Sequence, residues 1–145
     1  MATTFKGVNK TIIDSITPAT ILCPGLQGGN VRVMLDYYTA LGTEVATDTI
    51  EMCDELPIGA KIVEVIIENN DATTVLDVGD AEVNNRYIND ATVAAITRIN
   101  VLTGLYYTVD MTTAATPDNQ ILLTVRTATL TAGSVIGLAV FYTVE

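Results

Sequence analysis

The chain has 145 residues, of which 49% are hydrophobic and 17% are charged, a composition that predicts one folded domain and excludes a disordered chain. It carries 17 acidic and 7 basic residues, so its net charge is −10. Nucleic acid and anionic membranes are bound by clusters of Lys and Arg. Neither is therefore expected as a partner.

The first 17 residues are expected to form an N-terminal arm, followed by a single domain over residues 18–145. Residues 1–13 contain Lys6 and Lys10 and no acidic residue, so this segment is net positive. The rest of the chain carries 5 basic and 17 acidic residues, a net charge of −12. No apolar signal-peptide core is present in the arm, which favours synthesis and assembly in the cytoplasm.

Four apolar residues of the arm, Phe5, Val8, Ile12 and Ile13, are interpreted as following neither a helical nor a strand period over a useful length. They have no obvious place in a sandwich, so the arm is predicted to order when it docks on a partner. The alternative is that the arm forms an ordinary edge strand of the domain.

Alternating hydrophobic segments separated by turn residues predict about eight strands. In chain order they are residues 31–39, 49–53, 60–68, 74–79, 98–102, 105–110, 120–129 and 134–144, and residues 19–23 can add at most an edge strand. One helical turn or two is the interpretation of residues 90–96. The pattern indicates an all-β antiparallel sandwich or barrel with at most one short helix.

The segment 56–88 contains the hairpin around which the other strands are expected to assemble. On its first strand, Val63, Val65 and Ile67 lie on one face, which is the better candidate for the core. Ile62 and Ile66 lie on the other face with two glutamates. That mixed face suits a sheet surface covered by a partner or by the arm.

The last strand, residues 134–144, places its large apolar side chains on one face. Gly137 and Ala139 lie on the opposite face, where small residues allow a neighbour to approach closely. Because apolar residues occupy both faces of several strands and a two-layer sandwich covers only one face of each sheet, a homo-oligomer is predicted.

No arrangement of catalytic residues is present, and no enzyme activity, metal or cofactor is predicted. Histidine is absent, which removes the usual general base and the commonest zinc ligand. Glu64 and Glu68 share a strand face, but about 13 Å separates residues four apart on a strand, too far for a glycosidase pair. Asp77 and Asp80 could ligate calcium, although ordinary loop carboxylates are the simpler interpretation.

The order of several motifs resembles the capsid cement, or decoration, proteins of tailed bacteriophages. The resemblance rests on MATTFKGVNKTIID at residues 1–14, LPIGAK at 56–61, LDVGD at 76–80, Tyr87–Ile88 and AVFYTVE at 139–145. Together these motifs span most of the chain, and all of them are structural.

This resemblance implies a jelly-roll-like β-sandwich on the outer surface of a phage head. Such a protein would form a homodimer or homotrimer, bridge neighbouring major capsid proteins and stabilise the shell against the pressure of packaged DNA. Phe5, Lys6, Val8, Lys10 and Ile12 of the arm are then expected to contact the capsid. Gly137 and Ala139 are expected at the same contact or between subunits.

Two other classes of function are compatible with the residues. A jelly-roll component of a tail, baseplate or head fibre that binds host glycans would need a cluster of exposed aromatic rings. A small β-sandwich enzyme would need a pocket in which titratable groups converge, and the absence of histidine counts against it.

Overall fold

The computed structural model describes residues 2–7, 11, 14, 31–92, 95–100, 107–110 and 118–144. These residues contain ten strands: β1 (Thr4–Lys6), β2 (Arg32–Thr39), β3 (Thr49–Met52), β4 (Lys61–Asn69), β5 (Leu76–Gly79), β6 (Ile88–Ala91), β7 (Ala95–Asn100), β8 (Tyr107–Thr108), β9 (Ile121–Val125) and β10 (Val135–Thr143). The predicted all-β sandwich is confirmed. Within these ranges, no helix has the length and apolar character needed to cross a membrane.

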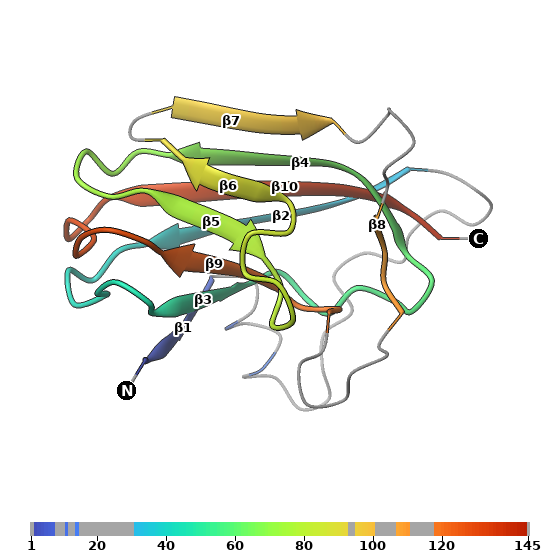
Figure 1. Cartoon of the computed structure of the whole chain (residues 1–145), viewed down its shortest axis with the longest axis horizontal. Helices are drawn as coiled ribbons and strands as arrows, with labels where there is room; N and C mark the ends of the chain where they lie inside the picture. The colour runs from blue at the N-terminus through green and yellow to red at the C-terminus, as the bar shows by residue number, and fades with distance from the viewer. Residues whose placement is uncertain are drawn as a thin grey trace.

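The strands form two sheets that lie face to face (Figure 1). The first sheet has the order β1-β3-β9-β5-β6, and the second has the order β2-β10-β4-β7, with β8 paired to β4 outside that path. Neighbouring strands are antiparallel except β1, which runs parallel to β3. Successive strands from β2 to β5 alternate between the sheets, so most of the interior is built from residues far apart in sequence.

The core fills the space between the two sheets with the inward side chains of alternating strands. Val65 and Ile67 are fully buried, as predicted, but Ile62 is also buried and Val63 is only partly so. The cause is a β-bulge: Phe141 pairs with Glu64 and Tyr142 with Ile62, so Val63 is an extra residue on β4. The bulge exchanges the inward and outward faces of β4.

A helical turn was predicted for residues 90–96, but the described residues 90–91 and 95–96 of this range lie in the strands β6 and β7. Pairing between β5 and β6 shifts register between Leu76 and Val78, and Asp90 adopts a positive φ of 59°. Its N–H donates to the buried Asp77 Oδ1 at 2.9 Å. Pairing of β7 with β4 satisfies the backbone of residues 95–100, so tertiary contacts override the weak local helix signal.

Buried carboxylates tie together the loops at one end of the sandwich. Glu44 has no exposed surface and accepts hydrogen bonds from the Tyr38 hydroxyl and from the N–H groups of Leu41, Gly42 and Thr43. Burial alone would raise the pKa of Glu44, but these donors outweigh it and lower that pKa.

Asp71 performs the same task in the loop between β4 and β5. It accepts from the N–H of Thr73 at 2.7 Å and reaches across to the N–H of Thr131 at 2.6 Å. Burial alone would raise the pKa of Asp71, but the hydrogen bonds from Thr73 and Thr131 hold it well below its usual range. Asp71 thereby fixes the loop between β4 and β5 to the loop between β9 and β10.

Candidate docking face

The carboxylates that could have formed a reactive or metal-binding group each have partners within the chain. Glu64 pairs with Arg98 on the neighbouring strand, and Asp77 forms an ion pair with Arg126 at 3.2 Å. Asp80 accepts from the N–H groups of Glu82 and Val83. In the ranges that the structure describes, no group of three or more metal-ligating side chains comes together. Glu64 and Asp77 therefore join neighbouring strands, and Asp80 fixes the loop after β5.

At the other end of the sandwich, Arg86 lies at the centre of a second polar cluster. Its guanidinium stacks 3.9 Å from the centre of the Tyr107 ring and forms ion pairs with Asp80 and Glu82. Burial would lower the pKa of Arg86, but Asp80 outweighs that effect and raises it. Tyr107 in turn donates to Asp118. A permanently charged Arg86 therefore joins the 80–87 loop to Tyr107 of β8.

Cys53 is a buried free thiol. Burial, with smaller contributions from Asp36 and Asp54, raises the pKa of Cys53 to about 12, so the thiol stays protonated and unreactive at neutral pH. Cys23 lies outside the described residues.

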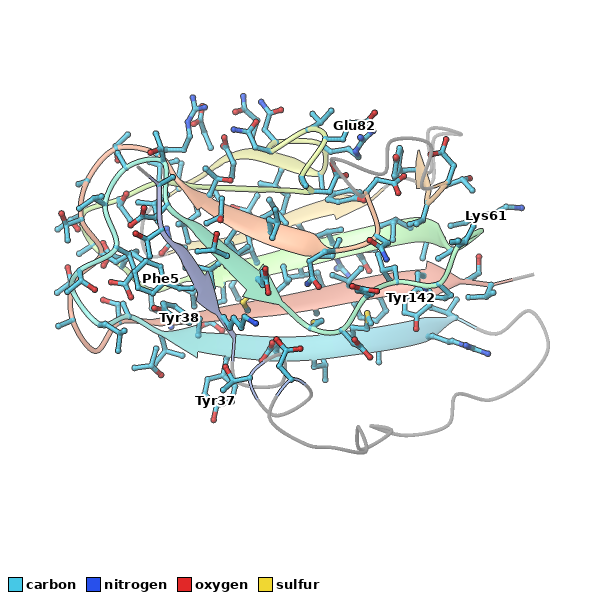
Figure 2. The ribbon with its side chains drawn as sticks, turned by 90° about the horizontal axis from the view of Figure 1, so that it is seen from below. Phe5, Tyr37, Tyr38, Lys61, Glu82 and Tyr142 are labelled. Atoms are coloured by element: carbon cyan, nitrogen blue, oxygen red, sulfur yellow. The ribbon has the colours of Figure 1, made fainter. Side chains whose placement is uncertain are left out.

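Residues 4–6 of the predicted arm belong to the sandwich. Residues 4–6 form β1 at the edge of the first sheet, and the partly buried ring of Phe5 packs against the core with its centre 6.4 Å from that of Tyr38 (Figure 2). The expectation that Phe5 has no place in the sandwich is therefore wrong, because a parallel edge strand offers it a half-covered site. Val8, Lys10 and Ile12 lie outside the described residues.

Lys6 forms ion pairs within its own chain, with Asp14 and, at 3.8 Å, with Glu51 on β3. The hydrogen bond to Asp14 raises the pKa of Lys6. Its charge is thus balanced locally by two carboxylates, and Lys6 helps to hold β1 in the first sheet.

The outward surface of the second sheet, here called the outer face, exposes several large apolar side chains. β2 contributes Val33, Leu35 and Tyr37, β10 contributes Gly137, Ala139 and Phe141, β4 contributes Glu64, Ile66 and Glu68, and β7 contributes Ile96 and Arg98. Leu35 is 60% exposed, Tyr37 50% and Ile96 69%. Large exposed apolar groups gathered on one sheet face are typical of a protein contact.

Strand register arranges the outer face in rows that cross the sheet. One row runs Tyr37–Gly137–Glu68, and the next runs Leu35–Ala139–Ile66. Bulky side chains of β2 and β4 therefore flank the two small residues of β10.

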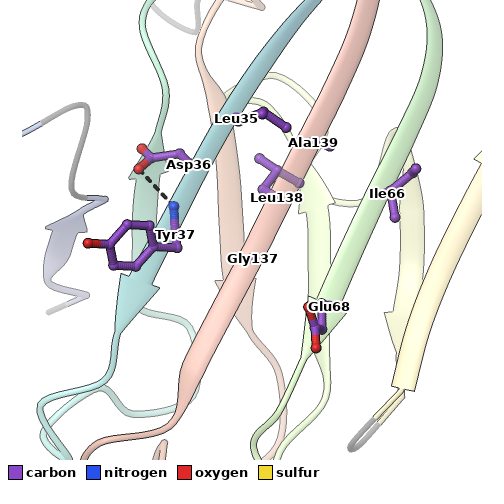
Figure 3. Close-up of a pocket in the computed structure, with 8 residues that line it drawn as sticks. All are labelled: Leu35, Asp36, Tyr37, Ile66, Glu68, Gly137, Leu138 and Ala139. Atoms are coloured by element: carbon purple, nitrogen blue, oxygen red, sulfur yellow. Dashed lines mark hydrogen bonds between the residues drawn. The ribbon is translucent and has the colours of Figure 1, made fainter.

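The result is a shallow groove of about 400 Å³ along β10 (Figure 3). Tyr37 lies on one side of the groove and Glu68 on the other. No catalytic group converges in it, so its chemistry is that of an apolar contact surface.

Sequence reasoning named Gly137 and Ala139, which line the groove, but did not name the residues that flank them. Val33, Leu35 and Tyr37 alternate along β2, and this pattern alone was compatible with a core-facing row. The opposite row of β2 contains Asp36 and Tyr38, which are the buried ones. Asp36 is tolerated inside because its carboxylate accepts from the N–H of Cys53 at 2.8 Å.

Comparison with known proteins identifies phage capsid chains as structural neighbours. No protein-family model matches the chain, and no curated protein matches it. The fold is similar to a chain of the cyanophage Pam1 capsid asymmetric unit, with 26% identity, a TM-score of 0.66, and coverage of 90% of this chain and 96% of that one.

A chain of the capsid of Ralstonia phage GP4 has the same fold, with 21% identity and a TM-score of 0.59 over 86% of this chain and 91% of that one. Both neighbours are almost entirely covered, so the shared fold makes up nearly their whole length. This protein is therefore similar to chains that occur in phage capsids, which supports a structural role in a virion.

Proposed function

We propose that the protein is a capsid cement protein that binds the outer surface of a phage head. It bridges neighbouring major capsid proteins and stabilises the shell against the pressure of packaged DNA. The observation that carries this proposal is the nearly end-to-end likeness to a chain of the Pam1 capsid asymmetric unit.

The strand order supports the jelly-roll form of the sandwich that such a role implies. A four-stranded sheet β2-β10-β4-β7 faces a sheet containing β3-β9-β5-β6, as expected when a long hairpin winds into two Greek keys. The net charge of −10 fits a position outside the shell, because a surface that contacts packaged DNA would need basic groups.

A non-enzymatic role agrees with the partners of the titratable groups. The aspartates and glutamates at both ends of the sandwich fix loops, and Cys53 is protonated and buried. Glycan binding would need several exposed rings, and of the described aromatic side chains only Tyr37 is largely exposed. The virion role therefore has more support than either alternative.

The proposal is tested on virions of the phage that encodes the chain, with and without its gene. We expect mass spectrometry of purified particles to find the protein at a stoichiometry comparable to that of the major capsid protein. Heads that lack it should release DNA at a lower temperature, and adding purified protein should restore the original value. A protein that is absent from particles, or present only in isolated tails, contradicts the proposal.

We also propose that the N-terminal segment contributes to capsid anchoring through its positive charge. Lys10 is the informative position, because Lys6 is already paired within the chain. Lys10→Glu should weaken binding to heads that lack the protein, whereas Asn85→Glu, which adds a negative charge in an exposed loop outside both the N-terminal segment and the outer face, should not. Equal binding by the two variants would assign the contact to another surface.

A further inference from the structure

The charged groups of the outer face nearly balance one another. Its charged groups are Glu64, Glu68 and Arg98, with Lys61 at the start of β4 beside them on the same side of the sheet, and Glu64 and Arg98 neutralise each other in an ion pair. Two acids and two bases on this side of the sheet give a formal charge of zero. Two copies of this acidic chain can meet there with little repulsion between carboxylates.

Gly137 is not required by the packing of its own chain. A β-carbon at this position would meet no atom closer than the Glu68 Cβ at 3.8 Å, an ordinary contact. Glycine in the middle of a strand weakens the strand, and it is expected where another backbone comes close. The space above Gly137 is therefore open to a second molecule.

We propose that the outer face binds the outer face of a second copy, related by a two-fold axis that runs along β10 over Gly137 and Ala139. This inference goes beyond the capsid role, and it can be tested on purified protein without a capsid. It identifies the surface and the geometry of the self-association.

The rows across the sheet are self-complementary under this symmetry. A two-fold axis along β10 exchanges the β2 side with the β4 side, so each contact occurs twice. Tyr37 then lies over the second copy's Glu68, to which its hydroxyl can donate a hydrogen bond. In the next row, Leu35 packs against the second copy's Ile66.

The size of the face fits a specific but weak dimer. Four strands about 4.8 Å apart and about 26 Å long present about 500 Å² per copy. Two copies would bury about 1,000 Å² in total, near the lower limit for a specific interface. Such a dimer should form in solution at micromolar concentrations, and a capsid that holds two copies side by side would strengthen it.

The first experiment is sedimentation velocity over a concentration series up to about 100 µM, a range that detects micromolar dissociation constants. We expect the wild-type chain to convert from monomer to dimer across the series. Leu35→Glu places a charge in the contact and should raise the dissociation constant at least tenfold. Ile58→Glu is the matched control, because Ile58 is 68% exposed outside the outer face and should leave the dissociation constant unchanged.

The second experiment tests the axis by disulfide cross-linking in a Cys23→Ser background. Ala139→Cys lies on the proposed axis and should form a cross-linked dimer on mild oxidation. Thr39→Cys lies on β2, one strand away from β10, and should cross-link many times more slowly. Equal rates would overturn the proposed geometry.

Two outcomes overturn the proposal while leaving the capsid role intact. A wild-type chain that stays monomeric throughout the series excludes the dimer. If that monomer binds heads and Leu35→Glu does not, the outer face contacts the major capsid protein. Conversely, a dimer that fails to bind heads would refute only the capsid role.

Discussion

Glu44 illustrates how much the end loops depend on a single buried side chain. It accepts four hydrogen bonds while having no exposed surface. A buried donor that loses its acceptor has no water to replace it, so the full desolvation penalty appears in the stability.

We therefore expect Glu44→Gln to lower the free energy of unfolding by about 2–4 kcal/mol, because an amide group keeps the shape but turns a donor toward N–H groups. Urea denaturation monitored by tyrosine fluorescence measures the change. Glu82→Gln, in an exposed loop, is the control and should cost less than about 1 kcal/mol. Similar losses for the two variants would show that burial of Glu44 is unimportant.

Asp71 and Glu44 should also make the stability depend on pH. Both have a folded pKa below the unfolded value of about 4, so their contribution is complete above that pH and is lost as the pH falls through the folded pKa. We expect the urea midpoint to fall steadily below about pH 4, and Asp71→Asn to show a shallower fall. An identical pH profile for Asp71→Asn would contradict this assignment.

At the scale of an element, Gly79 at the end of β5 explains the LDVGD motif. A β-carbon at Gly79 would lie 2.2 Å from the Val83 carbonyl oxygen and 2.4 Å from the Asn84 carbonyl carbon. The loop backbone folds directly over the strand end, a close approach that only glycine permits.

Gly79→Ala should therefore destabilise the fold by at least about 2 kcal/mol, because backbone atoms have to move. Gly137→Ala is the matched substitution on the central strand and should be neutral or stabilising by up to about 1 kcal/mol. Thermal unfolding of the two variants side by side measures the contrast. A Gly79→Ala variant as stable as Gly137→Ala would show that the 83–84 backbone shifts at little cost.

The strands with strict alternation were the most predictable elements. β10 was expected with Gly137 opposite a row of large apolar residues, and its burial follows that pattern. Predictions were wrong where contacts with partner strands, and not the local sequence pattern, determine the backbone conformation. The bulge at Val63 and the positive φ of Asp90 depend on partner strands, which a local pattern does not contain. The outer face was only partly predictable because both rows of β2 include apolar side chains.

At the scale of the molecule, strands differ in how well their neighbours protect them from local opening. β10 is flanked by β2 and β4, whereas β1 is a three-residue edge strand with a single neighbour, β3. Local opening is easiest for segments with few buried contacts and exposed hydrogen bonds.

We expect native-state hydrogen exchange to be slowest in β10 and β4 and fastest in β1 among the strands. Amides of β1 should exchange by local fraying, with opening free energies well below the global value. Mass spectrometry of exchanged peptides provides the measurement. Protection of β1 equal to that of β10 would mean that the N-terminal strand is an integral part of the global folding unit.

The position of β10 also has a consequence for the synthesis of the protein. It leaves the ribosome after every other strand that the structure describes, yet it lies between β2 and β4 and pairs with both. Until it emerges, the nascent chain presents two open strand edges bearing Val, Ile and Leu, which are prone to pair with other chains. A chain cut short before residue 135 would therefore keep those edges open and be removed by aggregation or proteolysis. Only chains translated through β10 would complete the second sheet.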